Sequence, residues 1–170
     1  MEMLKPTIYQ KDIFSIDYDK LLENNINNLL FDIDNTVATT KEKTPNQKVI
    51  KLFEELRKKG FNLFILTNAL KKRATSFGER LNVKTYYFSM KPSSRNYNKV
   101  IKENNLKVKH TAAIGDQIYT DIKGANKLGI TSILVDPIDK HEFITTKINR
   151  LKENKLISKT NIIKKGEYYE

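Results

Sequence analysis

The sequence contains no cysteine among its 170 residues, which excludes disulfide bridges, thiolate zinc sites and cysteine nucleophiles. It also lacks any apolar run that approaches the roughly 20 residues of a membrane-spanning helix. Residues 1–11 carry no apolar core of the kind found in signal peptides. We therefore expect a cytoplasmic protein, and the length and the absence of repeats or linkers predict a single domain over residues 1–170.

Acidic residues are fewer than basic ones, and the basic excess is concentrated in one part of the chain. The formal net charge is +11. Residues 1–28 carry three lysines and five acidic residues, whereas residues 70–110 carry eleven lysines and arginines and only two glutamates. Such a region attracts anions, which include phosphorylated ligands, nucleic acids and acidic membrane surfaces. A solvated, solubilising surface explains the charge equally well.

Apolar runs of strand length alternate with segments of helical periodicity from residue 29 onward. The first strand begins at residue 29, and further strands are predicted at 61–67, 83–88, 111–114 and 132–135. Helices are predicted at 17–24, 45–59, 70–81, 93–104, 118–128 and 139–152, with Thr44 and Pro45 beginning the second of them. This alternation predicts a three-layer α/β, Rossmann-like domain with a mainly parallel five-stranded sheet. Residues 1–28 are expected to form an approach segment that packs across the domain, and residues 154–170 a basic, flexible tail.

The first predicted strand leads directly into Asp32 and Asp34, with the hydroxyl of Thr36 two residues later. Two carboxylates at the end of a buried strand face desolvation and mutual repulsion, which a divalent cation would offset. By itself, an Asp-x-Asp pattern is equally typical of an acidic turn, because aspartate is a common turn residue. The other strand ends must decide between the two interpretations.

Polar side chains also follow the next three predicted strands, and they are Thr67 and Asn68, then Lys91, then Asp116 with Asp121. Parallel strands place their ligands beyond their carboxyl ends, so we expect these residues to meet. The carboxylates supply hard oxygen ligands suited to Mg²⁺, while a hydroxyl and a lysine suit phosphate oxygens. No cluster of histidine or cysteine offers a better zinc or copper site. The set favours phosphoryl transfer, in which one carboxylate attacks phosphorus and another is general acid and then general base.

These residues resemble the four motifs of the haloacid dehalogenase (HAD) superfamily of phosphatases, over roughly residues 29–136. The resemblance implies that Asp32 is a nucleophile that forms an aspartyl-phosphate intermediate. It implies that Asp34 protonates the leaving oxygen and later activates water. The acid at position 34 matters, because dehalogenase members of the superfamily lack it.

The resemblance also assigns the remaining members of the set. It implies that Thr67, Asn68 and Lys91 bind the transferring phosphoryl group. Mg²⁺ would be held by Asp32, the backbone carbonyl of Asp34, and Asp116. Thr36 and Asp121 would support the site, Asp121 through Lys91 or a metal-bound water.

A closer resemblance is to the YqeG-like branch of subfamily IIIA, some of whose members act on phosphatidylglycerophosphate. The stretches that carry it are residues 4–6, 31–36, 66–68, 115–121, 124–129 and 131–135. HAD enzymes usually carry a cap domain after the first motif or between the second and third, and the spacing here leaves no room for one. We therefore expect an open site that admits a large substrate or that a neighbouring subunit closes.

Four basic residues lie at the starts of two predicted helices beside the site, where cations oppose the helix macrodipole. They are Lys71, Lys72, Arg73 and Arg95. A second phosphate contact or an anionic membrane surface would explain them, and so would the general abundance of lysine.

Together these patterns predict a Mg²⁺-dependent phosphomonoester hydrolase, in the cytoplasm or peripheral at a membrane, that acts on phosphatidylglycerophosphate or another large anionic substrate. The first alternative is a non-catalytic module that binds RNA, the ribosome or a protein. The second is phosphoryl transfer to an acceptor other than water.

Overall fold

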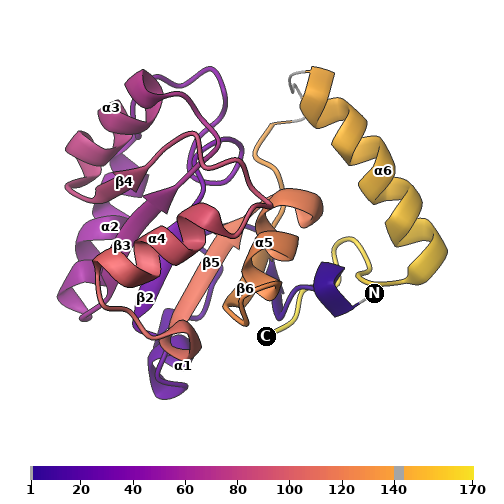
Figure 1. The fold of residues 1–170 in the computed structure, drawn as a ribbon, viewed down its shortest axis with the longest axis horizontal. Helices are drawn as coiled ribbons and strands as arrows, with labels where there is room; N and C mark the ends of the chain where they lie inside the picture. The colour runs from indigo at the N-terminus through magenta and orange to yellow at the C-terminus, as the bar shows by residue number, and fades with distance from the viewer. Residues whose placement is uncertain (1, 140–143) are drawn as a thin grey trace.

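Six parallel strands form the central sheet of the computed structural model, which describes residues 2–139 and 144–170 (Figure 1). The strand order is β1-β6-β5-β2-β3-β4, and every neighbouring pair is parallel. The strands are β1 (Ile8–Gln10), β2 (Asn28–Phe31), β3 (Asn62–Leu66), β4 (Lys84–Tyr86), β5 (Thr111–Gly115) and β6 (Thr131–Val135). The predicted α/β architecture is confirmed, whereas the predicted number of five strands is wrong.

The additional strand, β1, comes from the N-terminal segment that was expected only to pack across the domain. Ile8 lies opposite Ile133 of β6, and the backbone amide of Thr7 donates to the carbonyl of Ser132 at 2.9 Å. Three residues are too short to show the period-two pattern of a strand, so pairing with β6 determines this structure.

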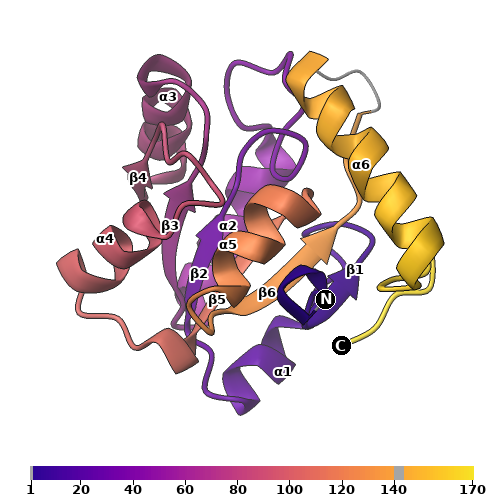
Figure 2. The same cartoon turned by 45° about the vertical axis from the view of Figure 1, so that its right-hand side comes forward.

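Helices cover both faces of the sheet (Figure 2). They are α1 (Tyr18–Glu23), α2 (Gln47–Lys58), α3 (Lys71–Leu81), α4 (Arg95–Glu103), α5 (Lys123–Asn126) and α6 (Ile144–Thr160), with the short turns η1 (Glu2–Leu4), η2 (Val108–His110) and η3 (Ile118–Ile122). Successive side chains of β2 point to opposite faces. Leu29 and Phe31 pack with α1, α2 and α3, whereas Leu30 packs with α4 and α5. The core therefore has two layers, and β2 lies between them.

Helix α2 begins two residues later than predicted. The side chain of Asn46 accepts a hydrogen bond from the backbone amide of Val49 at 3.1 Å, so Asn46 is the N-cap in place of Thr44. Asparagine is at least as good an N-cap as threonine, which is why the sequence alone did not separate them. Gly60 ends this region with a φ of +98°, a left-handed conformation that favours glycine.

The end of the chain is docked on the sheet, although a flexible tail was expected. Helix α6 continues to Thr160, and Tyr169 then forms an antiparallel bridge with Tyr9, with both hydrogen bonds at 2.8 Å. Ile163 is buried in a cluster with Tyr9 and Leu134. The predicted start of this helix cannot be compared, because residues 140–143 lie outside the described part of the chain. No helix in the described ranges is long and apolar enough to cross a membrane.

The connections around the site are short. The chain between Thr36 and Thr67 holds a loop, α2 and β3, and the chain between Thr67 and Lys91 holds α3 and β4. Neither of these fully described connections contains a cap domain, as predicted.

Candidate active site

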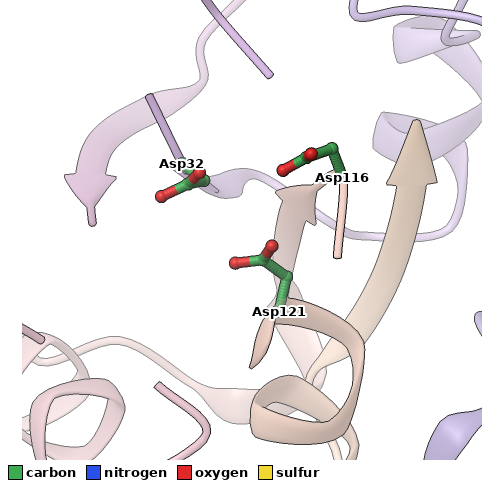
Figure 3. Close-up of side chains that lie close together, drawn as sticks. All are labelled: Asp32, Asp116 and Asp121. Carbon is green, nitrogen blue, oxygen red and sulfur yellow. The ribbon is translucent and has the colours of Figure 1, made fainter. Parts of the chain in front are cut away.

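Three buried carboxylates meet at the carboxyl edge of the sheet (Figure 3). Asp32 follows β2 and Asp116 follows β5, which are neighbours in the sheet, and Asp121 lies in η3. One carboxylate oxygen of each lies within 4.8 Å of the others, and their exposed fractions are 6%, 1% and 3%. The predicted convergence of strand ends therefore brings these three acids together.

Lys91 enters this cluster from the loop that follows β4. Its ammonium donates to Asp32 Oδ1 at 2.7 Å, to Asp121 Oδ1 at 2.5 Å and to the carbonyl of Leu66 at 3.0 Å. The side chain of Asn68 holds the backbone of Lys91 on both sides, since Oδ1 accepts from its amide at 2.8 Å and Nδ2 donates to its carbonyl at 3.4 Å. Lys91 thus has a fixed path into the site, and Asn68 positions it.

The cluster carries an excess of negative charge when its three carboxylates and one ammonium are ionised. Burial raises the pKa of Asp32 to about 6, while the charge of Lys91 opposes the rise and that of Asp121 adds to it. Burial lowers the pKa of Lys91, but the charges of Asp121 and Asp32 outweigh it, so the pKa is raised and the lysine stays protonated. Remaining negative charge among hard oxygen ligands fits a divalent cation such as Mg²⁺.

Gly115 allows Asp121 to approach the end of β5. A Cβ at Gly115 would lie 2.2 Å from Cγ of Asp121, so any larger residue would push this carboxylate away. The π-helical turn η3 places Asp121 there, and its Oδ2 accepts from the backbone amide of Gln117 at 3.1 Å. A continuous α-helix was predicted over 118–128, and the structure has this π-helical turn followed by α5 instead. Such turns are frequently found at functional sites.

Thr36 lies in the loop after β2, Thr67 directly follows the adjacent strand β3, and both are buried. The hydroxyl of Thr36 donates to Asp116 Oδ1 at 3.3 Å, which helps to orient that carboxylate. The hydroxyl oxygen of Thr67 accepts from the backbone amide of Ala69 at 3.1 Å, which orders the turn after β3. Binding of a phosphoryl group by Thr67 stays a prediction.

The side chain of Asp34 is outside the cluster of three buried carboxylates and pairs with Arg73. Arg73 Nε donates to Asp34 Oδ1 at 2.8 Å, and its other nitrogens donate to the carbonyls of Thr39, at 2.9 Å, and Glu42. The Asp34 side chain is about one-third exposed, with a relative accessibility of 32%. The task of Asp34 as the acid that serves the leaving group stays a prediction. Its backbone carbonyl stays a predicted metal ligand.

A family model described as haloacid dehalogenase-like hydrolase matches residues 7–135. The chain belongs to this family. A curated relative named "Probable phosphatase YqeG", from Bacillus subtilis (strain 168), is 31% identical over 153 residues, which are 90% of this chain and 89% of the relative. The superfamily and the enzyme class predicted from the sequence are therefore confirmed.

Solved structures share this fold at low sequence identity. The cobalt-bound deoxy-D-mannose-octulosonate 8-phosphate phosphatase of Haemophilus influenzae superposes with a TM-score of 0.56 at 16% identity, over 76% of this chain and 77% of that chain. A HAD family enzyme of Bacteroides thetaiotaomicron in a magnesium complex superposes with a TM-score of 0.55 at 13% identity, over 68% and 96%. These likenesses support the α/β fold of haloacid dehalogenase-like hydrolases.

The basic residues predicted at the rim of the haloacid dehalogenase-like site divide into two groups. Lys71, Lys72 and Arg95 are exposed and lie at the starts of α3 and α4. Arg73 is directed inward to Asp34, so the structure does not place it with the other three.

Two features of the site were missed by reasoning from the sequence. The pair of Asp34 and Arg73 joins residues 39 positions apart, and no spacing rule connects them. The contact of Gly115 with Asp121 was also missed, although the glycine directly before Asp116 was a signal for a close approach of another group.

Proposed function

We propose that this chain hydrolyses phosphomonoesters with the help of a divalent cation. We propose Mg²⁺ as this cation, because carboxylate oxygens are the ligands that suit it. The observation that carries this proposal is the buried cluster of Asp32, Asp116 and Asp121 around the ammonium of Lys91. An aspartate with a raised pKa beside a fixed positive charge is typical of reactive sites in clefts. The family membership of the chain supports the same chemistry.

Each residue has a defined task in the proposed reaction. A carboxylate oxygen of Asp32 attacks phosphorus and forms an aspartyl phosphate, while the bond from phosphorus to the leaving oxygen breaks and Asp34 gives that oxygen a proton. Water then attacks the phosphorus, Asp34 takes the proton of the water, and the bond to Asp32 breaks to release inorganic phosphate. Lys91 offsets the charge of the transferring group, and Asp121 holds Lys91 in place.

Asp32, Asp116 and the backbone carbonyl of Asp34 would hold the cation, with Thr36 orienting Asp116. When bound, the cation supplies positive charge that lowers the repulsion between the anionic substrate and the carboxylates. Asp121 is also close enough to contribute an oxygen, but we assign it the supporting task because both of its oxygens already accept hydrogen bonds, Oδ1 from Lys91 and Oδ2 from the backbone amide of Gln117.

The proposed substrate is large and anionic, and phosphatidylglycerophosphate is the example that the branch resemblance implies. The short connections on either side of Thr67 leave the site without a cap, so bulky groups are not excluded. Exposed cations at the starts of α3 and α4 favour additional negative charge on the substrate or beneath it. A peripheral location at a membrane follows from the same argument, and a nucleic acid substrate is the weaker proposal.

A non-catalytic binding module is not favoured. Four of the charged residues that the reaction needs are assembled and buried, which is costly for a protein that no longer uses them. They are Asp32, Lys91, Asp116 and Asp121.

The test is turnover of soluble phosphomonoesters with Mg²⁺ or with a chelator. Wild-type protein is expected to release phosphate only with the metal, and Asp32→Asn is expected to lower kcat at least about a thousandfold, because the nucleophile is lost. Asp19→Asn, which changes an exposed aspartate in α1, is the matched control and should leave turnover unchanged. Metal-independent turnover, or full activity of Asp32→Asn, would contradict the proposal.

The same assay separates hydrolysis from transfer. Hydrolysis releases one inorganic phosphate for each substrate consumed, whereas a shortfall that appears with an added alcohol shows transfer. Comparing phosphatidylglycerophosphate in mixed micelles with soluble phosphomonoesters, by kcat/KM, then tests the substrate.

A further inference from the structure

Three exposed apolar side chains lie in the two loops that lead from β3 and β4 to the proposed active site, and we name Leu70, Phe88 and Met90 the apolar ridge. Their exposed fractions are 70%, 60% and 66%. Leu70 directly precedes α3, and the other two lie in the loop between β4 and Lys91. Exposed apolar side chains that lie together on a surface typically mark a site of interaction with a partner.

Backbone hydrogen bonds join the two loops of the apolar ridge. The amide of Phe88 donates to the carbonyl of Ala69, and the amide of Ser89 donates to the carbonyl of Thr67, each at 3.0 Å. The buried hydroxyl of Ser89 donates to the carbonyl of Tyr86 at 2.8 Å. The ridge is therefore a built surface, in which Ser89 points inward between two residues whose side chains are exposed.

The backbone conformation of the apolar ridge lowers the stability of the fold. Phe88 and Met90 have φ values of +47° and +50°, in the left-handed region that bulky residues avoid. Leu70 is the N-cap of α3 and makes no capping hydrogen bond through its side chain. Strained backbone and missing caps are concentrated at functional sites, where a function is retained at a cost in folding stability.

Exposed cations lie in the elements next to the apolar ridge. Lys71 and Lys72 are exposed in the first turn of α3, and the ammonium of Lys71 lies 6.0 Å from the ring centroid of Tyr87. Arg95 is exposed at the start of α4, and the ammonium of Lys127 donates to the carbonyl of Pro92 at 3.2 Å. Apolar side chains within a field of positive charge match a partner that offers both an apolar phase and negative charge.

We propose that the apolar ridge and its cations dock the mouth of the active site onto an anionic lipid bilayer. Leu70, Phe88 and Met90 enter the boundary between headgroups and acyl chains, and Lys71, Lys72 and Arg95 lie among the headgroups. A second copy of the chain fits less well, because it would bring its own cations into the contact. A nucleic acid would match the cations but offers no apolar phase for Leu70 and Met90. The inference deepens the proposed function by naming the surface that brings this site to its substrate.

The test is sedimentation with vesicles, which requires no turnover. Wild-type protein is expected to bind vesicles of equal parts phosphatidylglycerol and phosphatidylcholine, to bind phosphatidylcholine alone weakly, and to lose affinity as salt is raised. The double variant Phe88→Asn with Met90→Asn should lose about tenfold or more in affinity, because the inserted apolar area is removed. Asparagine tolerates the left-handed conformation, so the backbone of the loop is retained.

A second variant separates loss of vesicle binding from loss of folding. Leu70→Ser removes an apolar side chain but supplies a good N-cap, so vesicle affinity should fall while the melting temperature is kept or raised. Met3→Asn is the matched control, because Met3 is 49% exposed and lies near the starts of β1 and β6, on the side of the sheet opposite to β4. It should bind vesicles like the wild type.

Several outcomes would overturn the inference. They are absence of wild-type binding to the anionic vesicles, equal affinity of the ridge variants, or a ridge that is needed instead for self-association or for binding to single-stranded RNA. Failure of the proposed function can be distinguished from failure of the docking proposal. A protein that binds vesicles through the ridge but has no phosphatase activity would contradict only the proposed function. Conversely, turnover of soluble esters without vesicle binding would remove only the docking surface.

Discussion

Arg73 illustrates how one side chain can hold several parts of a site together. Its guanidinium donates to the carboxylate of Asp34 and to the carbonyls of Thr39 and Glu42. The rigid fork of arginine suits such a set of acceptors, which a single ammonium cannot reach together. Arg73 therefore orients the predicted acid and the loop after it, so we treat it as a positioning residue.

We expect Arg73→Gln to lower kcat by about 10- to 100-fold and to leave KM nearly unchanged, because Asp34 loses its orientation while phosphate binding is retained. Arg73→Lys should recover only part of kcat. Steady-state kinetics with a soluble phosphomonoester measure both parameters. Arg80→Gln, a change at an exposed arginine in the last turn of the same helix, is the control. A raised KM with an unchanged kcat would instead return Arg73 to the substrate rim that the sequence predicted.

At the scale of elements, the carboxyl ends of β2 and β5 concentrate more negative charge than Lys91 can offset. Asp32 and Asp116 follow neighbouring strands, so their carboxylates are held close whether or not a cation is bound. The repulsion lowers the stability of the metal-free fold, and a cation that binds only the native state raises it. Stability therefore reports on the metal site without any assay of turnover.

We expect Mg²⁺ to raise the free energy of unfolding by about 2.7 kcal/mol at a concentration near 100 times its Kd. Asp116→Asn should abolish this response, because a carboxylate ligand is replaced by a neutral amide. In the metal-free state the same variant should be at least as stable as the wild type, since it relieves the repulsion with Asp32. Thermal and urea unfolding, each with Mg²⁺ and with a chelator, measure these effects.

Asp19→Asn is again the control, since Asp19 is exposed in α1 and pairs with Lys59 and not with a member of the cluster. A full Mg²⁺ response in Asp116→Asn would show that the cation binds elsewhere, and would remove Asp116 from the proposed ligands.

The elements that local patterns determine were predictable, and those that tertiary neighbours determine were not. The apolar run before Asp32 and the carboxyl edge of the sheet follow from strand length and from parallel topology, so Asp32 and Asp116 could be brought together from the sequence. Strand β1 depends on β6 for its ladder, and the π-helical turn depends on the contact of Asp121 with Gly115. Neither leaves a periodic signal.

At the scale of the whole molecule, the two ends of the chain complete one edge of the sheet. The C-terminal residues lie beside β1, where Tyr169 pairs with Tyr9 through two backbone hydrogen bonds (Figure 2). The hydroxyls of Tyr9 and Tyr168 donate to the two carboxylate oxygens of Asp136 at 2.6 and 2.7 Å. An uncovered edge strand is open to pairing with other chains, so this docking protects β1.

We expect deletion of residues 161–170 to lower the free energy of unfolding by about 2–4 kcal/mol. The deletion removes the buried Ile163, and the backbone groups of Tyr9 lose their hydrogen bonds to Tyr169. Urea unfolding measures the change, and the midpoint should fall without a large change in slope. Tyr168→Phe, which removes one partner of Asp136, should cost only about 1 kcal/mol. An unchanged midpoint after the deletion would support the flexible tail that the composition of residues 154–170 predicted. A loss of the expected size shows that apolar contacts of a few residues hold a basic segment on the sheet, which its composition alone does not reveal.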